Sequence, residues 1–341
     1  MVAAITAMFL VAPMGFAQAV AKKDPVKVDA RTEEVVHGAL KWLAASQLPN
    51  GSWGTSGLEK QHPTAMTGYA LLAFLAGGHL PGEGEFGKTV SSGMDYLLNS
   101  LSPEGLYSTR ESGQYMYGHG VATIALAELY GSSKSPAART KLDRAIRLII
   151  SSQNRDGGWR YRPVASDADI SVTVLQVTAL RAAKNAGIDV PQRTIDNAIK
   201  YVKSCQHAPS GGFCYQPNQS PGYARTAAAI YSLQVCGLYE DEMVKRGADY
   251  LLKNMKEREQ WFTYGSFYAA PALYMIGGDQ WSQWYQQMKG LLLQNAIKRG
   301  DTYYWESKLD RGNDGVGPTY ATSVYAMILA MPYHYIPLYQ R

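Results

Sequence analysis

The chain has 341 residues, of which 46% are hydrophobic and 18% are charged. This composition supports a large packed core and argues against a long disordered tract. The formal net charge of +5 is spread along the chain, and no Lys/Arg cluster is interleaved with aromatic residues, so no nucleic-acid binding is expected.

The first 21 residues carry no charge and combine an apolar stretch with small residues at Ala17 and Ala19. This pattern is typical of a secretory signal peptide cleaved near Ala19. The alternative is an uncleaved N-terminal membrane anchor. We therefore expect an exported protein, periplasmic or secreted, or one held at the membrane by this segment. The expected divisions are a signal peptide or anchor over 1–19, a short linker over 20–30 and a single domain over 31–341.

Three segments of the chain share one pattern. "ALKWLAASQLPNGSW" ends at Trp53, "AIRLIISSQNRDGGW" ends at Trp159, and "AIKYVKSCQHAPSGGF" ends at Phe213. Each is an amphipathic helix followed by Gln, a spacer, a Gly and an aromatic residue. The Gly can adopt the positive φ that ends a helix and reverses the chain. The Gln side chain can satisfy backbone groups left open at the helix end.

Weaker copies of this pattern end at Tyr107, Phe262 and Trp305, and a second apolar helix rich in small residues follows each turn. The second helices suit an interior, whereas the more charged first helices suit an outer layer. The glycines of the first four turns are 54, 52 and 54 residues apart, at Gly51, Gly105, Gly157 and Gly211.

A period of this length fits one helical hairpin per repeat, so the chain contains six hairpins. An open solenoid needs polar caps at its ends, and the terminal repeats show none. The sequence therefore predicts an all-α fold, an (α/α)6 toroid or barrel with an inner and an outer ring of helices. An open superhelix is the alternative.

The elements Gln47…Trp53 and Gln153…Trp159 resemble the QW repeats of squalene-hopene and oxidosqualene cyclases. Protein prenyltransferase β subunits share that toroid. The resemblance covers almost the whole chain after residue 30 and implies the toroid fold. It says less about function, because this fold hosts several chemistries.

A closer resemblance follows Trp159, where the chain reads Asp167-Ala168-Asp169-Ile170. Bacterial squalene-hopene cyclases carry Asp-x-Asp-Asp at this place. The resemblance implies that Asp169 falls on the proton donor and Asp167 on the first Asp, while Ile170 replaces the third. The structural alternative is helix capping, with Asp167 as the N-cap and Asp169 in the first turn.

In a toroid of hairpins the inner helices run parallel, so their N-termini meet at one mouth. We expect ligand-binding side chains there, beside Asp167 and Asp169. The candidates are His62, Tyr117, His119, Tyr223, Arg225, Tyr264, Tyr268 and Tyr320.

Several of these candidates also have structural interpretations. His119 can simply bond a neighbouring backbone group, and the tyrosines can be core residues. Arg225 can pair with Asp167 or Asp169, which would disqualify Asp169 as a proton donor. The loop from Ser307 to Pro318 is either a lid or a plain surface loop.

No metal and no cofactor is expected. Prenyltransferase β subunits bind zinc through an Asp-x-Cys pair, and Tyr223 and Arg225 stand at those positions here. Cys205, Cys214 and His207 do not form a zinc spacing either. Cys205 and Cys214 flank one turn and form either a disulfide or two buried thiols.

The tryptophans at the repeat turns are interpreted as structural residues rather than ligand contacts. They are Trp53, Trp159, Trp261 and Trp305.

Three functions remain open, and whether the protein is an enzyme stays undecided. The favoured one is an exported toroid that binds an apolar or mixed ligand, such as an isoprenoid-like small molecule, or a protein partner, without full cyclase activity. The second is a squalene-type terpene cyclase initiated by protonation from Asp169. The third is glycan processing, which Asp167 and Asp169 suit poorly because such carboxylates face each other across a cleft.

Overall fold

The computed structural model describes residues 26–107, 115–255, 261–311, 315–333 and 335–336. The predicted signal segment over 1–19 and most of the predicted linker over 20–30 lie outside these residues. None of the helices in the described part is long and apolar enough to cross a membrane.

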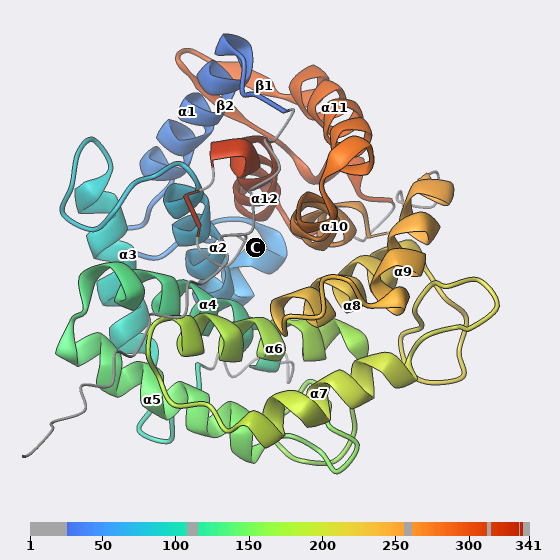
Figure 1. Ribbon diagram of the computed structural model, residues 1–341. Helices are drawn as coiled ribbons and strands as arrows, with labels where there is room; N and C mark the ends of the chain where they lie inside the picture. The colour runs from blue at the N-terminus through green and yellow to red at the C-terminus, as the bar shows by residue number, and fades with distance from the viewer. Residues whose placement is uncertain (1–25, 108–114, 256–260, 312–314, 334, 337–341) are drawn as a thin grey trace, which may run out of the picture.

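Twelve α-helices in the described residues alternate between an outer and an inner position (Figure 1). The outer helices are α1 (Ala30–Ala45), α3 (Gly87–Ser100), α5 (Pro136–Ser151), α7 (Gln192–Ser204), α9 (Glu242–Lys253) and α11 (Gly278–Asn295). The inner helices are α2 (Pro63–Ala76), α4 (Tyr115–Ser133), α6 (Ile170–Asn185), α8 (Tyr223–Val235), α10 (Phe262–Ile276) and α12 (Pro318–Ala330). Three 3-10 turns complete these elements: η1 (Gly57–Gln61), η3 (Ser307–Leu309) and η4 (Met331–Tyr333).

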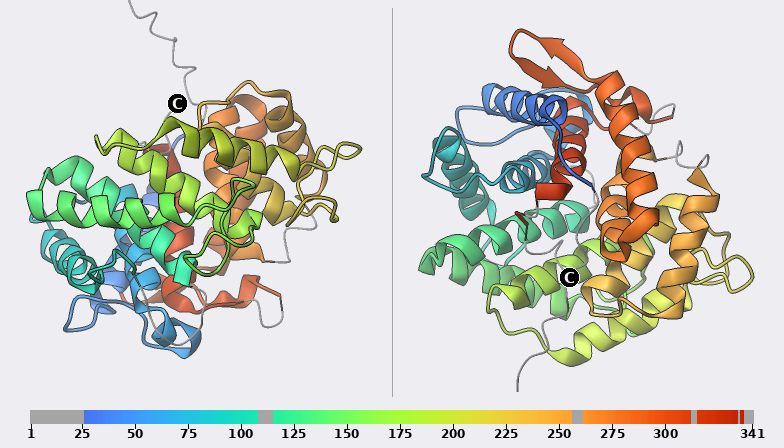
Figure 2. Two further views of the ribbon diagram at one scale, coloured as in Figure 1. Left: turned by 90° about the horizontal axis from the view of Figure 1, so that it is seen from below. Right: turned by 45° about the horizontal axis from the view of Figure 1, so that its top comes forward.

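The inner helices form a closed ring (Figures 1 and 2). Each packs against the next from α2 to α12, and α12 packs back against α2. The predicted (α/α)6 toroid is therefore confirmed, and the open superhelix is wrong. Closure removes the exposed helix faces that an open solenoid must cap with polar residues.

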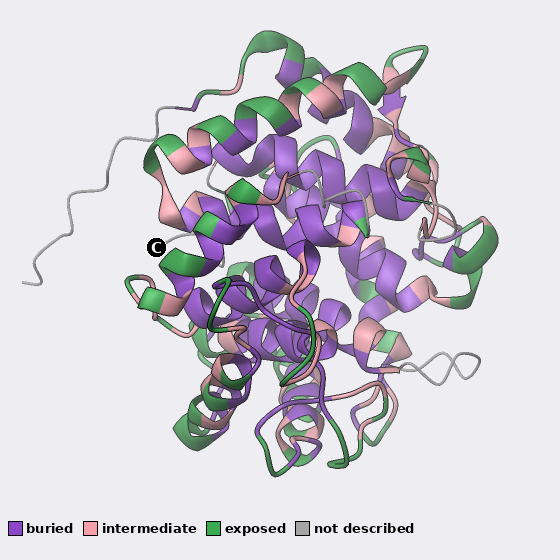
Figure 3. Cartoon of the chain, turned by 90° about the vertical axis from the view of Figure 1, so that its right-hand side faces the viewer, coloured by how far each residue is buried: buried purple, intermediate pink, exposed green. Residues whose placement is uncertain are grey.

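The burial of the two rings follows their sequences. In α2 every residue after Pro63 is buried, as expected for a helix with neighbours on all sides. In α5 the buried residues recur every three or four positions, which gives one apolar face and one charged face. Figure 3 shows this division, with buried residues inside and exposed residues on the outer helices.

Three of the tryptophans at the repeat turns each fix an outer helix to the inner helix of the same repeat. The Trp53 indole Nε1 donates to the Leu43 carbonyl at 2.7 Å, and the Trp53 backbone N–H donates to Thr67 Oγ1 at 3.2 Å. The same two bonds recur at Trp159 with Ile149 and Thr173, and at Trp305 with Leu292 and Thr322. These buried tryptophans satisfy backbone groups that would otherwise be unpaired in the core.

The glutamine of the repeat fixes its turn to the following outer helix. Gln47 Nε2 donates to the carbonyls of Gly51 at 3.0 Å and Thr89 at 2.9 Å. Gln153 Nε2 repeats this with Gly157 and Thr194 at 2.8 and 2.9 Å. One side chain therefore closes a turn and joins adjacent hairpins.

The last two repeats depart from the pattern. The predicted copy that ends at Trp305 contains an antiparallel hairpin of β1 (Ile297–Arg299) and β2 (Thr302–Tyr304). Gly300, with φ of 63°, allows its tight turn. In the fifth repeat Phe262 lies inside α10 rather than in the turn before it.

Two inner helices are capped by carboxylates from loops of a neighbouring repeat. The buried Glu59 carboxylate, in η1, accepts a hydrogen bond from the Tyr320 N–H in the first turn of α12 at 2.9 Å. The Asp310 carboxylate, after η3, accepts one from the Thr263 N–H in α10 at 2.9 Å. Because η1 belongs to the first repeat and α12 to the last, Glu59 joins the two ends of the ring.

Candidate functional site

A cavity of about 660 Å³ opens where the inner helices begin. Every inner helix contributes to its wall a residue from its first two turns. The wall is dominated by six tyrosines: Tyr69, Tyr117, Tyr161, Tyr215, Tyr264 and Tyr320. Aromatic faces with hydroxyl tips give a surface that contacts apolar groups and still offers hydrogen bonds.

The structure brings five of the eight predicted ligand-binding residues together on this wall. They are His62, Tyr117, Arg225, Tyr264 and Tyr320. Burial lowers the pKa of His62, so its imidazole is neutral near pH 7.

His119 does not line the cavity, because it is fully buried against the outer ring. Its Nδ1 accepts a hydrogen bond from the Tyr107 N–H at 3.3 Å, and its Nε2 lies 3.2 Å from the Ala145 carbonyl. His119 therefore takes the place that Thr67 has in the first repeat. Burial lowers the pKa of His119 to about 4, which leaves the ring neutral.

Tyr223 and Tyr268 also lie behind the cavity wall rather than on it. The Trp284 indole of α11 donates to the Tyr223 hydroxyl at 2.9 Å, which turns that side chain toward the outer ring. Tyr268 is buried against Tyr264, with ring centroids 4.9 Å apart. Helix spacing placed both residues near the mouth, but their side chains point into the core.

The cavity wall also contains residues that the sequence analysis did not single out for it. Tyr161 and Tyr215 come from the loops before α6 and α8. Asp310 and Val316, from the loop of Ser307–Pro318, reach the wall as well, so this loop is part of the site. Residues 312–314 within it lie outside the described residues.

Trp261 corrects the interpretation of the tryptophans as purely structural. Trp53, Trp159 and Trp305 are fully buried, but Trp261 is 49% exposed and lines the cavity. Its backbone has φ of 55°, a left-handed conformation that is unusual for a bulky residue. Strain of this kind clusters at ligand sites.

Asp169 is the N-cap of α6, a position that the sequence analysis gave to Asp167. Its Oδ1 accepts a hydrogen bond from the Val172 N–H at 2.9 Å, and the side chain is fully buried. Asp167 lies on the surface, where its Oδ1 accepts from the Ala168 N–H at 2.8 Å. The helix starts two residues later than predicted.

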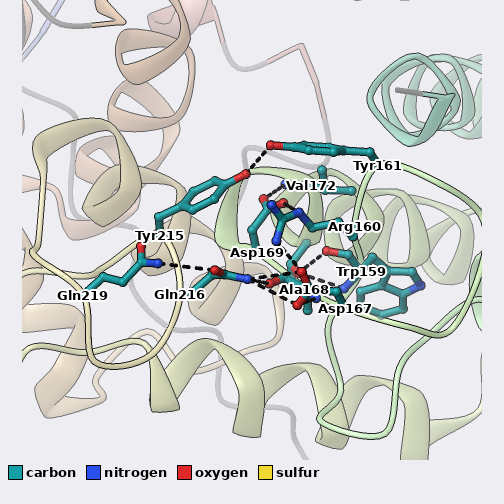
Figure 4. A network of polar contacts seen from close by, with 11 residues as sticks. Trp159, Arg160, Tyr161, Asp167, Ala168, Asp169, Val172, Tyr215, Gln216 and Gln219 are labelled. Atoms are coloured by element: carbon teal, nitrogen blue, oxygen red, sulfur yellow. Dashed lines mark hydrogen bonds and ion pairs between the residues drawn. The ribbon is translucent and has the colours of Figure 1, made fainter. Parts of the chain in front are cut away.

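Arg160, not Arg225, pairs with these carboxylates (Figure 4). Its Nε lies 3.1 Å from Asp169 Oδ2, and its Nη1 lies 2.5 Å from Asp167 Oδ2. The guanidinium carbon also lies 4.8 Å from the ring centroid of Tyr161 and 5.5 Å from that of Tyr215. Arg225, in contrast, donates to the Ser220 carbonyl at 2.8 Å.

Two tyrosines stand between the cavity and this ion pair. The hydroxyls of Tyr161 and Tyr215 are 2.5 Å apart, and both rings line the cavity while packing on Arg160. Burial raises the pKa of Asp169 to about 6, against the opposing effects of the Val172 N–H, the Tyr215 hydroxyl and Arg160. Asp169 itself does not line the cavity.

The described residues contain no group of three or more His, Cys, Asp or Glu able to hold a metal ion. Cys205 and Cys214 are free buried thiols, so the disulfide considered from the sequence is not formed. Burial raises the pKa of Cys205 to about 12, which makes this thiol unreactive.

The solved structures that share this architecture include a sugar epimerase and a terpene cyclase. Cellobiose 2-epimerase from Bacillus thermoamylovorans is 11% identical, with a TM-score of 0.64 over 88% of this chain and 99% of that one. A variant of the type II terpene cyclase MstE from Scytonema, bound to merosterolic acid A, is 14% identical, with a TM-score of 0.57 over 89% and 97%. At these identities the likeness shows the fold alone.

One relative in sequence is the drimenyl diphosphate synthase of Streptomyces showdoensis. It is 28% identical over 192 residues, which are 56% of this chain and 34% of that protein. The chain therefore matches about a third of the length of this relative. The family described as "Prenyltransferase alpha-alpha toroid domain" matches residues 20–196 and 171–271. Together with the closed ring of inner helices, this match shows that the chain belongs to the prenyltransferase alpha-alpha toroid domain family.

Proposed function

We propose that the protein binds an amphipathic small molecule in the tyrosine-lined cavity, and that it does not start a cyclisation by protonation from Asp169. The observation that carries this proposal is the position of the acid. Asp169 is tied to the Val172 N–H and to Arg160, behind the hydroxyl-bonded pair of Tyr161 and Tyr215. Burial still raises the pKa of Asp169 to about 6, but the guanidinium opposes this effect and favours the ionised carboxylate, and the tyrosine pair separates the acid from the cavity.

The cavity wall supports binding of a mixed ligand. Its volume lies in the range of small-molecule sites. Ala65, Met66 and Val316 supply apolar contacts, and the tyrosine rings add aromatic faces with hydroxyl tips. An isoprenoid-like chain with one polar end matches such a surface.

A pair of glycine substitutions tests the proposal. Gly118 lines the cavity in α4 and has only ordinary contacts around its added Cβ, whereas Gly290 lies on the outer helix α11 with nothing within 4 Å. We expect Gly118→Leu to abolish retention of any co-purifying lipid, or of added farnesol, in native mass spectrometry. Gly290→Leu should retain the ligand like the wild type. Equal retention by both variants would contradict the cavity as the binding site.

A terpene cyclase is the second candidate. It is favoured by the pKa of Asp169, raised to about 6 by burial, and by the likeness to a drimenyl diphosphate synthase. The Tyr215 hydroxyl lies near Asp169 and on the cavity wall, so it could pass a proton. Incubation with squalene and with farnesyl diphosphate tests this idea. Cyclic product that disappears in Asp169→Asn would establish it.

Glycan processing and binding to a protein partner have less support. Of the described residues that line the wall, one is acidic, Asp310. Its two oxygens accept hydrogen bonds from the N–H and the hydroxyl of Thr263 at 2.9 and 2.5 Å. A glycosidase needs two carboxylates free to act across a cleft. A glycan array tests this alternative, and co-purification from native membranes and extracts tests a protein partner.

We also propose export through the segment 1–19, on the strength of its composition. N-terminal sequencing of the mature protein tests this. A new N-terminus near Ala19 is expected, and an intact N-terminus on a cytoplasmic protein would contradict export.

A further inference from the structure

A second concave region of the protein is a groove of about 450 Å³, a volume within the range of small-molecule sites. Its walls come from the turn after α5, from the C-terminal half of α7 and from the loops before α6 and α8. The described residues that line it include none from an inner helix and none that line the tyrosine-rich cavity. The groove is therefore a separate candidate site.

The loops that form the groove are held in place by hydrogen bonds. Gln216 Nε2, from the loop before α8, donates to the Ala168 carbonyl at 2.8 Å and to Asp167 Oδ1 at 3.2 Å (Figure 4). The turn after α5 is joined to α7 in the same way, because Gln153 Nε2 donates to the Thr194 carbonyl at 2.9 Å. A ligand thus meets a surface that is already formed.

Asn154 lines this groove although it is only 5% exposed. Its Oδ1 accepts hydrogen bonds from the N–H groups of Asp156 at 3.1 Å and Gly158 at 2.9 Å. The other end of the amide, Nδ2, has no acceptor in the part of the chain that the structure describes. It therefore offers two N–H donors to a molecule in the groove.

The repeat turn does not require an amide at this position. In the first repeat the Leu48 N–H donates to the Ser52 carbonyl at 2.8 Å, just as the Asn154 N–H donates to the Gly158 carbonyl at 3.0 Å in the third. A leucine thus forms the same turn without any polar side chain. The amide of Asn154 is not needed for the path of the backbone, which points to a second role.

The other polar groups of the groove carry both signs of charge. Lys200 of α7 is exposed, and its ammonium pairs with none of the described residues. Asp156 supplies an exposed carboxylate, and the carboxylate of Asp167 is already neutralised by Arg160. The groove thus has no excess charge that would select an ion. It offers donors and acceptors together, which matches hydroxyl groups because each hydroxyl both donates and accepts.

The apolar lining of the groove completes this match. Ala168, Tyr201 and Pro217 supply carbon surface next to the polar groups. A pyranose ring has the complementary structure, with hydroxyl groups around its rim and C–H groups on its two faces. We propose that the groove binds a sugar unit of a neutral carbohydrate, with Asn154 Nδ2 and Lys200 donating to its hydroxyls and Asp156 accepting from them. This inference goes beyond the proposed function and does not depend on it.

A glycan array with the full chain, followed by saturation-transfer NMR and titration of the best neutral glycan, tests the inference. We expect at least one neutral glycan to bind the wild type. Asn154→Asp keeps an acceptor for the Asp156 and Gly158 N–H groups but removes the donor, so it should weaken binding about tenfold or more. Lys200→Met changes an exposed side chain, so it tests the site without disturbing the fold, and it should also weaken binding.

Lys88→Met is the matched control, because Lys88 is an exposed lysine of the outer helix α3 that does not line the groove. It should bind the glycan like the wild type, as should Gly118→Leu, which fills the cavity. The inference is overturned if no neutral glycan binds, if Asn154→Asp and Lys200→Met both keep full affinity, or if Gly118→Leu abolishes binding. Retention of farnesol by Asn154→Asp and Lys200→Met is measured in parallel, so a failure of the groove is distinguished from a failure of the proposed function.

Discussion

Arg160 and Asp169 form an ion pair at the start of α6, with Arg160 Nε 3.1 Å from Asp169 Oδ2. The carboxylate is fully buried, whereas the arginine side chain is 25% exposed. The pair joins the loop after the third repeat turn to the N-cap of its inner helix. This ion pair therefore has a structural role, whether or not the cavity is catalytic.

Removing the cation should destabilise the protein in a pH-dependent way. Arg160→Met leaves Asp169 buried without its partner, which raises the pKa of Asp169 further. We expect a loss of about 2 kcal/mol at pH 8 and a smaller loss at pH 5, where the carboxyl is protonated. Urea denaturation at both pH values measures this difference. In the Asp169→Asn background, adding Arg160→Met should cost the same free energy of unfolding at pH 8 and at pH 5. If the single variant Arg160→Met loses the same free energy of unfolding at both pH values, the account is contradicted.

The titration of Asp169 itself gives a second prediction. Its pKa is raised from 3.8 to about 6, so the unfolded chain releases this proton more readily than the folded one. The contribution to stability is full below pH 3.8 and is lost as the pH rises through 6, by about 3 kcal/mol. Asp169→Asn keeps an N-cap acceptor and should abolish this loss. Subtracting its stability profile from that of the wild type isolates the effect, and a flat difference would refute it.

His119 should have the opposite effect on the free energy of unfolding between about pH 4 and pH 6.5. Its pKa is lowered from 6.5 to about 4, so the folded protein gains stability above pH 6.5 and loses it as the pH falls toward 4. His119→Thr keeps an acceptor for the Tyr107 N–H, as in the first repeat, and should remove this acid sensitivity. Denaturation between pH 4 and 7 tests it. Unchanged acid sensitivity in the variant would show that His119 is not its source.

Glu59 adds a hydrogen bond to the closure of the ring, beside the packing of α12 on α2. Glu59→Ala removes the acceptor at the start of α12 and should cost about 1–2 kcal/mol of unfolding free energy. Thermal and urea denaturation measure it, with Glu83→Ala as the control because Glu83 is exposed on the loop before α3. If both variants have the same stability, Glu59 does not stabilise the junction between the first and last repeats.

The fold could be predicted from the sequence because its determinants are local and repeated. Gln47, Gly51 and Trp53 act within one turn and on the next helix, so their spacing carries the geometry directly. The hairpin of β1 and β2 was not predicted, since its signal is a single Gly300 between two short segments. The closing contact of Glu59 with Tyr320 spans 261 positions, and no local pattern encodes it.

The site was only partly predictable for a related reason. Helix spacing finds residues at the start of an inner helix, and it found Tyr117, Tyr264 and Tyr320. It does not fix which way a side chain points, so Tyr223 and Tyr268 were misplaced. Tyr161 and Tyr215 lie on loops, whose paths no periodicity describes. Arg225 was considered as the partner of Asp169, but Arg160 takes this place from a loop that no periodicity describes.

The measurement that tests the central claim most directly is titration of farnesol and farnesoic acid into the wild type, Gly118→Leu and Gly290→Leu, with product analysis of the same samples. The account predicts that the wild type and Gly290→Leu bind at least one probe, that Gly118→Leu binds neither, and that both probes are recovered unchanged. Equal binding by Gly118→Leu, or a cyclic product that Asp169→Asn abolishes, would contradict it.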